Sequence, residues 1–209
     1  MATTTTNYGF DIPQSTDLVK DGATAIATLG QDIDTAMNTA LGTKKAGMVL
    51  LNTTSFSGVA SQSVNDVFSA TYNNYRIVCH LTNTSTADGL TLRLRVSGAD
   101  NSTSNYNAAR VESNASASAN RYQAGVTSFD VNATDDGGVA HGFVLDLQAP
   151  FASNRTVGQV ISMGQDSSAN YSSRSGGYVF SATTSFTGYT LLIGSGTITG
   201  SLSTYAYNA

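Results

Sequence analysis

The feature that most constrains the fold is an alternation of apolar and polar residues with a period of two, repeated in many short segments. In "LTLRLRV" (90–96) every second residue is Leu or Val, and Thr or Arg stands between them. The segment "YRIVCHL" (75–81) shows a similar alternation. A period of two places apolar side chains on one face of a strand, so both segments are expected to be half-buried β-strands.

The chain after residue 47 continues as short strand-like segments separated by turn-like ones. Further strands are expected at 48–52, 122–130, 139–147, 156–163, 177–182, 189–193 and 197–207. Turns are expected at the strings "SGADNSTSN", "TDDGG" and "SSRSGG", and a low-complexity loop is expected at 112–120. Many short strands without helical patterns between them predict a mainly β fold, an antiparallel, jelly-roll-like β-sandwich.

One stretch near the N-terminus, about residues 17–41, has a helical pattern instead. Its small and apolar residues recur every seven positions, which is typical of a coiled-coil seam. The seam consists of Val19, Ile26, Ile33 and Ala40 at one heptad position and Gly22, Leu29 and Ala36 at the other. Ile and Leu at these positions favour a dimer, but one complete Ile/Leu heptad does not decide the number of chains. The alternative is an amphipathic helix that lies on the β domain of its own chain.

The segment before the helix is expected to be extended. Tyr8, Phe10 and Ile12 alternate with other residues ahead of Pro13. Exposed apolar side chains at a terminus need a surface to lie on, which is this chain, a sister subunit or another protein. We therefore expect an arm for attachment and oligomerisation at 1–46 and a β-sandwich head at 47–209.

Composition and charge exclude several classes of partner. Charged residues make up 11% of the chain, against about 25% in ordinary domains, and the net charge is −4. Lys and Arg are scattered, so no nucleic-acid partner is expected, because proteins that bind nucleic acid show a basic patch. The sequence opens without a secretory pattern and has no apolar run of membrane-spanning length, so we expect synthesis in a cytosol without insertion in a membrane.

Residues that carry catalysis are few and poorly grouped. Glu112 is the only glutamate, whereas a glycosidase usually needs two facing carboxylates. Most aspartates, including the adjacent Asp135 and Asp136, stand in turn-like contexts, where Asp bonds to the backbone. His80 and His141 are isolated, and a metal site needs more ligands at recognisable spacing. We therefore expect no enzymatic activity, no catalytic residue, no cofactor and no metal.

Residues 7–37, "NYGFDIPQSTDLVKDGATAIATLGQDIDTAM", resemble the N-terminal segment of many tailed-bacteriophage structural proteins, variously minor tail proteins, tail fibres or head fibres. The shared pattern is an aromatic-Gly-aromatic start, a Pro, "TDLVKDGA" and a short helix with "LG" and "ID". Four further strings resemble a phage virion domain: "SFSGVASQSVNDVFSATYNNYRIVCHL" (55–81), "LRLRVSGADNSTSNY" (92–106), "APFASNRT" (149–156) and "TSFTGYTLLIGSGTITGSLSTYAY" (184–207). The resemblance implies an arm that anchors a fibre or spike to the virion and starts its oligomerisation, with trimers usual and no catalytic site.

The sequence thus predicts a non-enzymatic structural component of a bacteriophage virion, assembled from copies of itself in contact with other virion proteins. The helix residues Val19, Ile26, Leu29, Ile33, Ala36 and Ala40 are expected to join the copies, and Tyr8, Phe10, Ile12 and Pro13 to anchor them. The favoured site is the capsid, as a decoration protein, head fibre or short spike. The alternative is a tail fibre or minor tail protein that binds host-surface glycans through loops at 98–107, 112–120 and 166–177.

Overall fold

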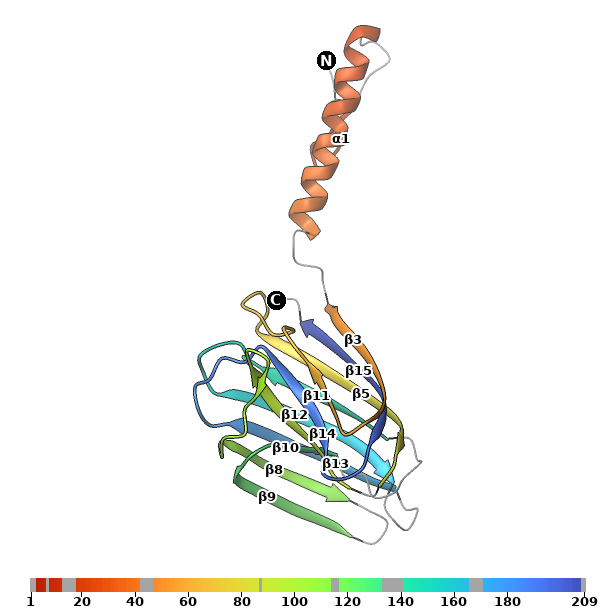
Figure 1. The fold of residues 1–209 in the computed structure, drawn as a ribbon. Helices are drawn as coiled ribbons and strands as arrows, with labels where there is room; N and C mark the ends of the chain where they lie inside the picture. Colours follow the sequence, from red (N-terminus) through yellow and green to blue (C-terminus); the bar gives the residue numbers. More distant parts are fainter. Residues whose placement is uncertain are drawn as a thin grey trace. The chain divides into compact units, whose positions relative to one another are not determined.

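The computed structural model describes residues 3–6, 8–12, 18–41, 47–86, 88–113, 117–132, 141–165 and 171–207. The chain forms two compact units, Met1–Gly47 and Met48–Ala209. The first contains two very short strands and the helix, and the second contains the remaining strands (Figure 1). Among the described residues the fold is mainly β with a single N-terminal helix, which confirms the predicted fold class.

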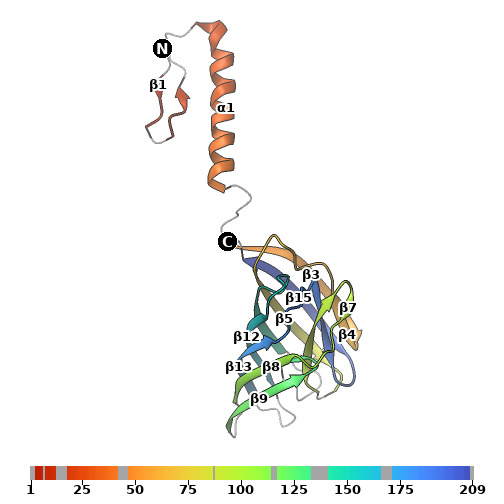
Figure 2. The ribbon, with the colours of Figure 1, turned by 90° about the vertical axis from the view of Figure 1, so that its left-hand side faces the viewer.

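The first unit is a small hairpin beside a helix (Figure 2). Strand β1 (Thr3–Thr4) pairs antiparallel with β2 (Asp11–Ile12), and helix α1 spans Val19–Leu41. Asp21 lies in the first helical turn, where a negative charge stabilises the positive end of the helix dipole. The helix ends at the predicted residue. The sequence also predicts an N-cap at residues 15–17 and a C-terminal cap at Gly42, and these positions lie outside the described residues.

The second unit is built from two antiparallel sheets. The larger has eight strands in the order β3, β15, β5, β11, β12, β13, β8, β9, and the smaller has β10, β6, β14 and β4, with β7 paired to β6. The bounds are β3 Met48–Val59, β4 Ser61–Val64, β5 Asn74–Thr84, β6 Leu90–Val96, β7 Ala99–Asp100, β8 Tyr106–Ser113, β9 Ser118–Val126, β10 Phe129–Asn132, β11 His141–Gln148, β12 Thr156–Gln165, β13 Tyr171–Phe180, β14 Gly188–Ile193 and β15 Ile198–Tyr207.

The core lies between these two sheets and follows the alternation read from the sequence. Leu90, Leu92 and Leu94 of β6 are buried, as are Ile77 and Leu81 of β5. An aromatic cluster fills one part of the core with edge-to-face contacts. Its members are Tyr106, Phe129, Tyr178, Phe180 and Phe186, with ring centroids 4.7–4.9 Å apart in successive pairs. Such edge-to-face contacts stabilise the fold beyond the contribution from burying the apolar surface of the rings.

Three local predictions are wrong. The expected strand at 122–130 is two strands in different sheets, because β9 ends at Val126 and β10 begins at Phe129. The loop expected at 112–120 is strand at both of its ends, since β8 continues to Ser113 and β9 begins at Ser118, and residues 114–116 are not described. The turn expected at "SSRSGG" lies inside β13, whose Gly176 packs closely on β8: a Cβ at this position would clash with Arg110. Here glycine serves close packing instead of a turn.

Candidate interaction surface of the N-terminal unit

The hairpin of the first unit is closed by backbone hydrogen bonds. The Thr5 amide donates to the Phe10 carbonyl at 2.9 Å, and the Gly9 amide donates to the Thr5 carbonyl at 3.0 Å. The Thr5 hydroxyl oxygen also accepts from the Phe10 amide at 2.9 Å. Gly9 has a φ of +68°, which favours glycine at this tip. The expectation of an extended segment is therefore corrected to a hairpin over the described residues 3–6 and 8–12.

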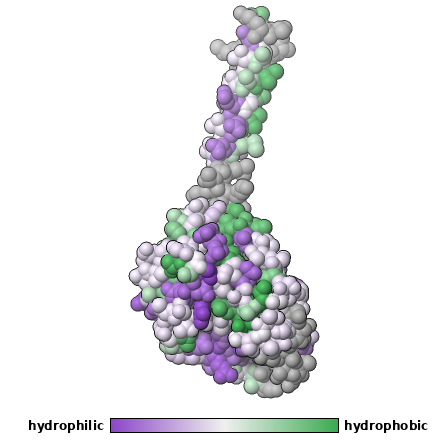
Figure 3. Space-filling view, in the orientation of Figure 1, coloured by the Kyte–Doolittle hydropathy of each residue, from purple (hydrophilic) through white to green (hydrophobic). Residues whose placement is uncertain are grey.

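The helix exposes an apolar face along one side. Ile26 is 67% exposed, Ile33 39% and Met37 56%, and Leu18 just before the helix is 62% exposed. Figure 3 shows hydrophobic residues gathered along one side of α1 and hydrophilic ones along the opposite side. None of the side chains described in this unit is buried. An amphipathic helix is normally stabilised by burying its apolar face. Within the described part of this unit, only the hairpin lies beside that face, and it leaves the face largely exposed.

The hairpin and the helix share a shallow apolar hollow. The rings of Tyr8 and Phe10 stack with centroids 5.5 Å apart and an interplanar angle of 18°. Together with four helical residues they line a hollow of about 250 Å³; the helical residues are Ile33, Ala36, Met37 and Ala40. These two rings thus lie beside the helix of their own chain, and contacts with a sister subunit or another protein stay a prediction. Two of the expected anchoring residues thus share a hollow with three of the expected oligomerisation residues, Ile33, Ala36 and Ala40.

The structure places most of the predicted site residues on this surface. Ile26, Ile33 and Ala40 are exposed, and Leu29 and Ala36 are half-buried. Val19 is the first helical residue, its side chain is not described, and Pro13 lies outside the described residues. Met37 was missed, because the heptad pattern was read at two of its seven positions. Met37 lies one residue after Ala36. As a large apolar side chain next to the predicted seam, it could have been included in the apolar face from the sequence. The oligomerising role of these residues stays a prediction.

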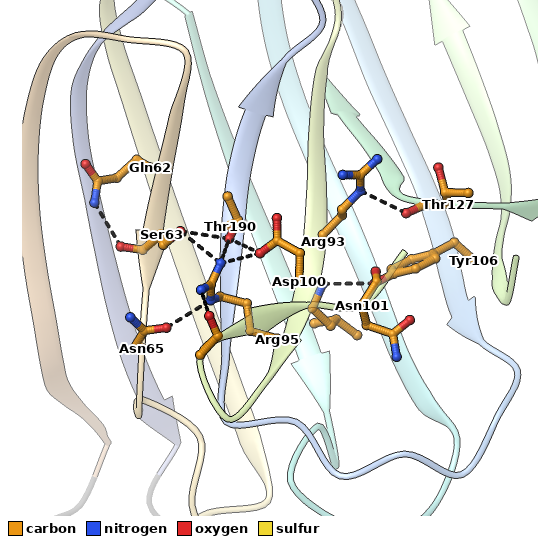
Figure 4. A network of polar contacts seen from close by, with 12 residues as sticks. Gln62, Ser63, Asn65, Arg93, Arg95, Asp100, Asn101, Tyr106, Thr127 and Thr190 are labelled. Atoms are coloured by element: carbon orange, nitrogen blue, oxygen red, sulfur yellow. Dashed lines mark hydrogen bonds and ion pairs between the residues drawn. The ribbon is translucent and has the colours of Figure 1, made fainter. Parts of the chain in front are cut away.

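The second unit contains two clusters of charged side chains, and the first surrounds Arg95 (Figure 4). Its guanidinium donates to Asn65 Oδ1 at 2.9 Å, Ser63 Oγ at 3.0 Å and Thr190 Oγ1 at 2.6 Å. It also bonds the Asp100 carboxylate and the Gly98 carbonyl. Each of the three guanidinium nitrogens thus donates to at least one acceptor of the protein, which is the arrangement of a structural contact. The cluster clamps the β6–β7 hairpin onto β14 and β4.

Replacing Arg95 with alanine is expected to lower the free energy of unfolding by about 2–3 kcal/mol, because the half-buried Asp100 carboxylate loses its cation. Equilibrium urea unfolding measures this change. The matched control is Arg93→Ala on the same strand, whose half-buried side chain donates one hydrogen bond, to the Thr127 carbonyl at 3.2 Å. Its expected cost is below about 1 kcal/mol. Equal costs for the two variants would contradict a clamping role for Arg95.

The second cluster lies where β8, β9 and β13 face β10. Arg110 pairs with Glu112 and with Asp130, each at 2.7 Å, and its side chain is 5% exposed. Arg174 also contacts Asp130 at 2.7 Å and Glu112 at 3.1 Å, and Arg121 contacts Glu112 at 3.2 Å. Burial raises the pKa of Asp130, while Arg174 and Arg110 act in the opposite direction. All five side chains are engaged with one another, which is the arrangement of a structural ion cluster.

The assignment of most aspartates to turns is wrong for three of them. Asp100, Asp130 and Asp146 lie in strands and each pairs with an arginine. Asp135 and Asp136 lie outside the described residues. Of the loops expected to bind glycans, 171–177 belongs to β13 and 166–170 is not described.

The other chemically reactive side chains are dispersed. His80 is exposed, whereas His141 is buried and its Nδ1 accepts a hydrogen bond from the Gln165 amide at 3.3 Å. Burial raises the pKa of the Cys79 thiol, which favours its unreactive protonated form. Within the described ranges, no three His, Cys, Asp or Glu side chains gather as a metal-ligand set. The described part of the chain also holds no helix long and apolar enough to cross a membrane.

The exposed face of α1 with the adjoining hairpin is thus the candidate interaction surface of the first unit. It is defined by Tyr8, Phe10, Ile26, Ile33 and Met37, and we call it the α1 surface. Comparisons with known proteins assign the chain to no family, since no family model matches its sequence and a search of curated proteins finds no match.

Proposed function

We propose that the protein is a non-enzymatic structural component of a bacteriophage virion, an oligomer joined and anchored through the α1 surface. The observation that carries the proposal is the exposure of this surface in a single chain. Ile26, at the centre of the predicted seam, is 67% exposed, and no described side chain of the unit is buried. Such a face is completed by association.

Association supplies the stability that the helix lacks alone. Intrinsic helix propensity contributes little to the stability of a helix, which comes mostly from packing of its apolar face. Gly22 and Gly30 each lower the propensity of this helix further. Full burial of a side chain such as Ile or Met contributes about 1.5–3 kcal/mol. Ile26, Ile33 and Met37 from each copy therefore offer several kilocalories per mole to a bundle. A seven-residue repeat is the pattern by which copies of one helix meet each other.

The virion assignment is supported by the sequence resemblance of residues 7–37 and of the four strings in the second unit. The favoured position is on the capsid, as a decoration protein, head fibre or short spike, with the β-sandwich displayed outward in a trimer. The second candidate is a tail fibre or minor tail protein that acts as a receptor-binding adhesin. It is favoured by a hollowed outer sheet face with an exposed tyrosine, described below.

The double substitution Ile26→Asp with Ile33→Asp is expected to convert the oligomer to single chains. Two aspartates per copy in an apolar seam would be neither solvated nor paired. Light scattering should then give a mass of 21.6 kDa, whereas the unmodified protein should give two or three times this mass. The same variant, produced in infected cells in place of the native chain, should be absent from purified particles, as judged by immunogold labelling and cryo-EM.

The matched control is Thr24→Asp with Gln31→Asp, which adds the same charge on the opposite side of α1. This control should keep both the oligomeric mass and the incorporation into particles. An unchanged mass for the Ile26/Ile33 variant would contradict the seam. A monomeric variant that still enters particles would show that anchoring is independent of oligomerisation, and absence of the unmodified protein from particles would refute the virion assignment.

A further inference from the structure

The outer face of the larger sheet carries a shallow trough that crosses six strands. One row of cross-strand partners runs along it, namely Arg76, Asp146, Gln159, Gly177, Ala109 and Tyr122. Two hollows of about 330 and 510 Å³ lie along this row and share Ser175 and Gly176 in their linings. We call the row and its hollows the outer-face trough. At about 4.8 Å per strand the row spans roughly 24 Å, which suits an extended ligand.

The middle of the trough is low because its residues are small. Gly177, Ala109 and Ser175 form the floor, while Ile161 on one side is 69% exposed and Tyr122 on the other is 78% exposed. Floor and walls belong to paired strands of one sheet, so the shape is held by the backbone hydrogen bonds of the sheet. A preformed concave surface loses little conformational entropy on binding.

Two adjacent glycines of β13 show that the open floor is not a requirement of the fold. A Cβ at Gly176 would clash with Arg110, so packing demands that glycine. A Cβ at Gly177 would meet only the Gly158 carbonyl oxygen, at 3.9 Å, which is an ordinary contact. Glycine inside a strand weakens it and marks a bulge or the close approach of a ligand or another backbone. The register of Gly177 with Gln159 and Ala109 is continuous, which excludes a bulge. The open space above this glycine allows a ligand to approach the sheet closely.

The β5–β12 end of the trough presents polar groups in fixed positions. Asp146 accepts hydrogen bonds from Arg76 Nε at 2.7 Å, Arg76 Nη2 at 2.6 Å and the Tyr207 hydroxyl at 2.9 Å. The hydrogen bonds from Arg76 hold the pKa of Asp146 below its ordinary value. Among the described residues none accepts from Nη1 of Arg76, and none bonds the side-chain amide of Gln159. This end therefore offers donors and acceptors with no net charge.

The β9 end presents an aromatic ring to solvent. Tyr122 is the most exposed large hydrophobic side chain described, and Asn120 and Arg121 line the same hollow. A tyrosine ring gives rigid contact area at low entropic cost, and amides beside it give adaptable hydrogen bonds. The trough thus pairs a flat apolar ring with a rim of neutral or charge-paired polar groups. A pyranose has the complementary pair of surfaces, an apolar C–H face and a rim of hydroxyls.

We propose that the outer-face trough binds a saccharide chain, with Tyr122 against the C–H face of one sugar and Arg76, Asp146 and Gln159 bonding the hydroxyls of another. A peptide added as a strand needs a free sheet edge, whereas the trough lies on a face whose backbone groups are already paired. A nucleic acid needs unpaired cations, and Arg76 is paired. The inference concerns the second unit alone and does not rest on the proposed function. It places the saccharide contact on a sheet face, away from the loops expected from the sequence.

The test compares the full-length protein with two trough variants on an array of bacterial, plant and animal oligosaccharides, followed by calorimetric titration of the best-bound saccharide. Gly177→Leu fills the floor and is expected to weaken binding at least 100-fold. Tyr122→Ala removes the exposed ring and is expected to weaken binding at least tenfold. Both should keep the melting temperature of the unmodified protein, because neither side chain is packed in the core. The matched control, Ser173→Leu, adds the same side chain on the same strand and face, outside the trough, and should leave binding unchanged.

Each outcome decides the proposal. Saccharide binding that is lost in Gly177→Leu and kept in Ser173→Leu supports it. Absence of binding to every saccharide overturns it, as does binding that survives both trough substitutions. Capture of a protein or peptide through the same residues, without any saccharide, shows that the ligand class is wrong. Light scattering on the same samples separates this test from the proposed function, because the trough and the α1 surface belong to different units.

Discussion

Replacing Tyr106 with alanine is expected to lower the free energy of unfolding by about 4–5 kcal/mol. Tyr106 is fully buried, and its ring meets Phe129 at 4.7 Å and Phe180 at 4.9 Å between centroids. Its hydroxyl accepts from the Leu94 amide at 3.0 Å and donates to the Asn101 carbonyl at 2.7 Å. The side chain thus ties β8 of the larger sheet to β6 of the smaller one. Its loss leaves both a cavity and a buried N–H without its acceptor.

Tyr106→Phe separates the two contributions. The ring contacts remain, and the lost hydrogen bonds should cost about 1–3 kcal/mol. Tyr122→Ala removes the same side chain from an exposed site and should change stability by less than about 0.5 kcal/mol. Urea unfolding followed by circular dichroism gives all three values. A Tyr106→Ala cost no larger than that of Tyr106→Phe would show that the aromatic cluster contributes little.

Replacing Asp130 with alanine is expected to lower the free energy of unfolding by about 3–5 kcal/mol, for an electrostatic reason. The ion cluster holds three arginines and two carboxylates, so it carries one excess positive charge. Removing Asp130 leaves Arg110 and Arg174, whose side chains are 5% and 14% exposed, with Glu112 as their shared anion. Buried cations without counterions are expensive, so the folded state is penalised.

Arg110→Ala provides the matched comparison for Asp130→Ala. It leaves two arginines facing two carboxylates, a balanced set, and is expected to cost about 1–2 kcal/mol less than Asp130→Ala. Both variants are measured by urea unfolding at constant ionic strength. An Arg110→Ala variant at least as unstable as Asp130→Ala would contradict the charge-balance account, and would assign the cost to the packed stem of the arginine.

The sequence predicted elements best where a periodic pattern is local. The strand at 90–96 has the predicted bounds, and the helix ends at the predicted Leu41, because each pattern repeats several times within a few turns or pleats. The prediction of one strand at 122–130 was wrong because the segment is divided between two sheets, after Val126 and before Phe129. That division is decided by partners distant in the chain, since β9 pairs with β8 and β10 pairs with β6.

The charged clusters could not be predicted for the same physical reason. Asp130 pairs with arginines 20 and 44 residues away along the chain, which no local spacing reveals. One signal was available: Arg110 and Glu112 stand two apart in a strand and therefore share a face. The trough was equally hidden, because it is made of cross-strand neighbours from six strands. The helical part of the α1 surface was more predictable, since Ile26 and Ile33 are neighbours on one face of one helix.

The position of β15 in the larger sheet sets the order of events during synthesis. This strand lies between β3 and β5 and pairs with both, and the three strands lie side by side in Figure 1. Until residues 198–207 have left the ribosome, β3 and β5 lack the strand that separates them in the sheet. The backbone groups that these two strands direct toward β15 are then unpaired. The nascent chain therefore exposes unpaired strand edges, which are prone to aggregation. Pairing of β15 with β3 and β5 is a late step, because the paired residues are far apart in the sequence. A ribosome-stalled chain that ends before residue 198 should recruit chaperones, and the full chain, held clear of the ribosome by an added C-terminal linker, should release them.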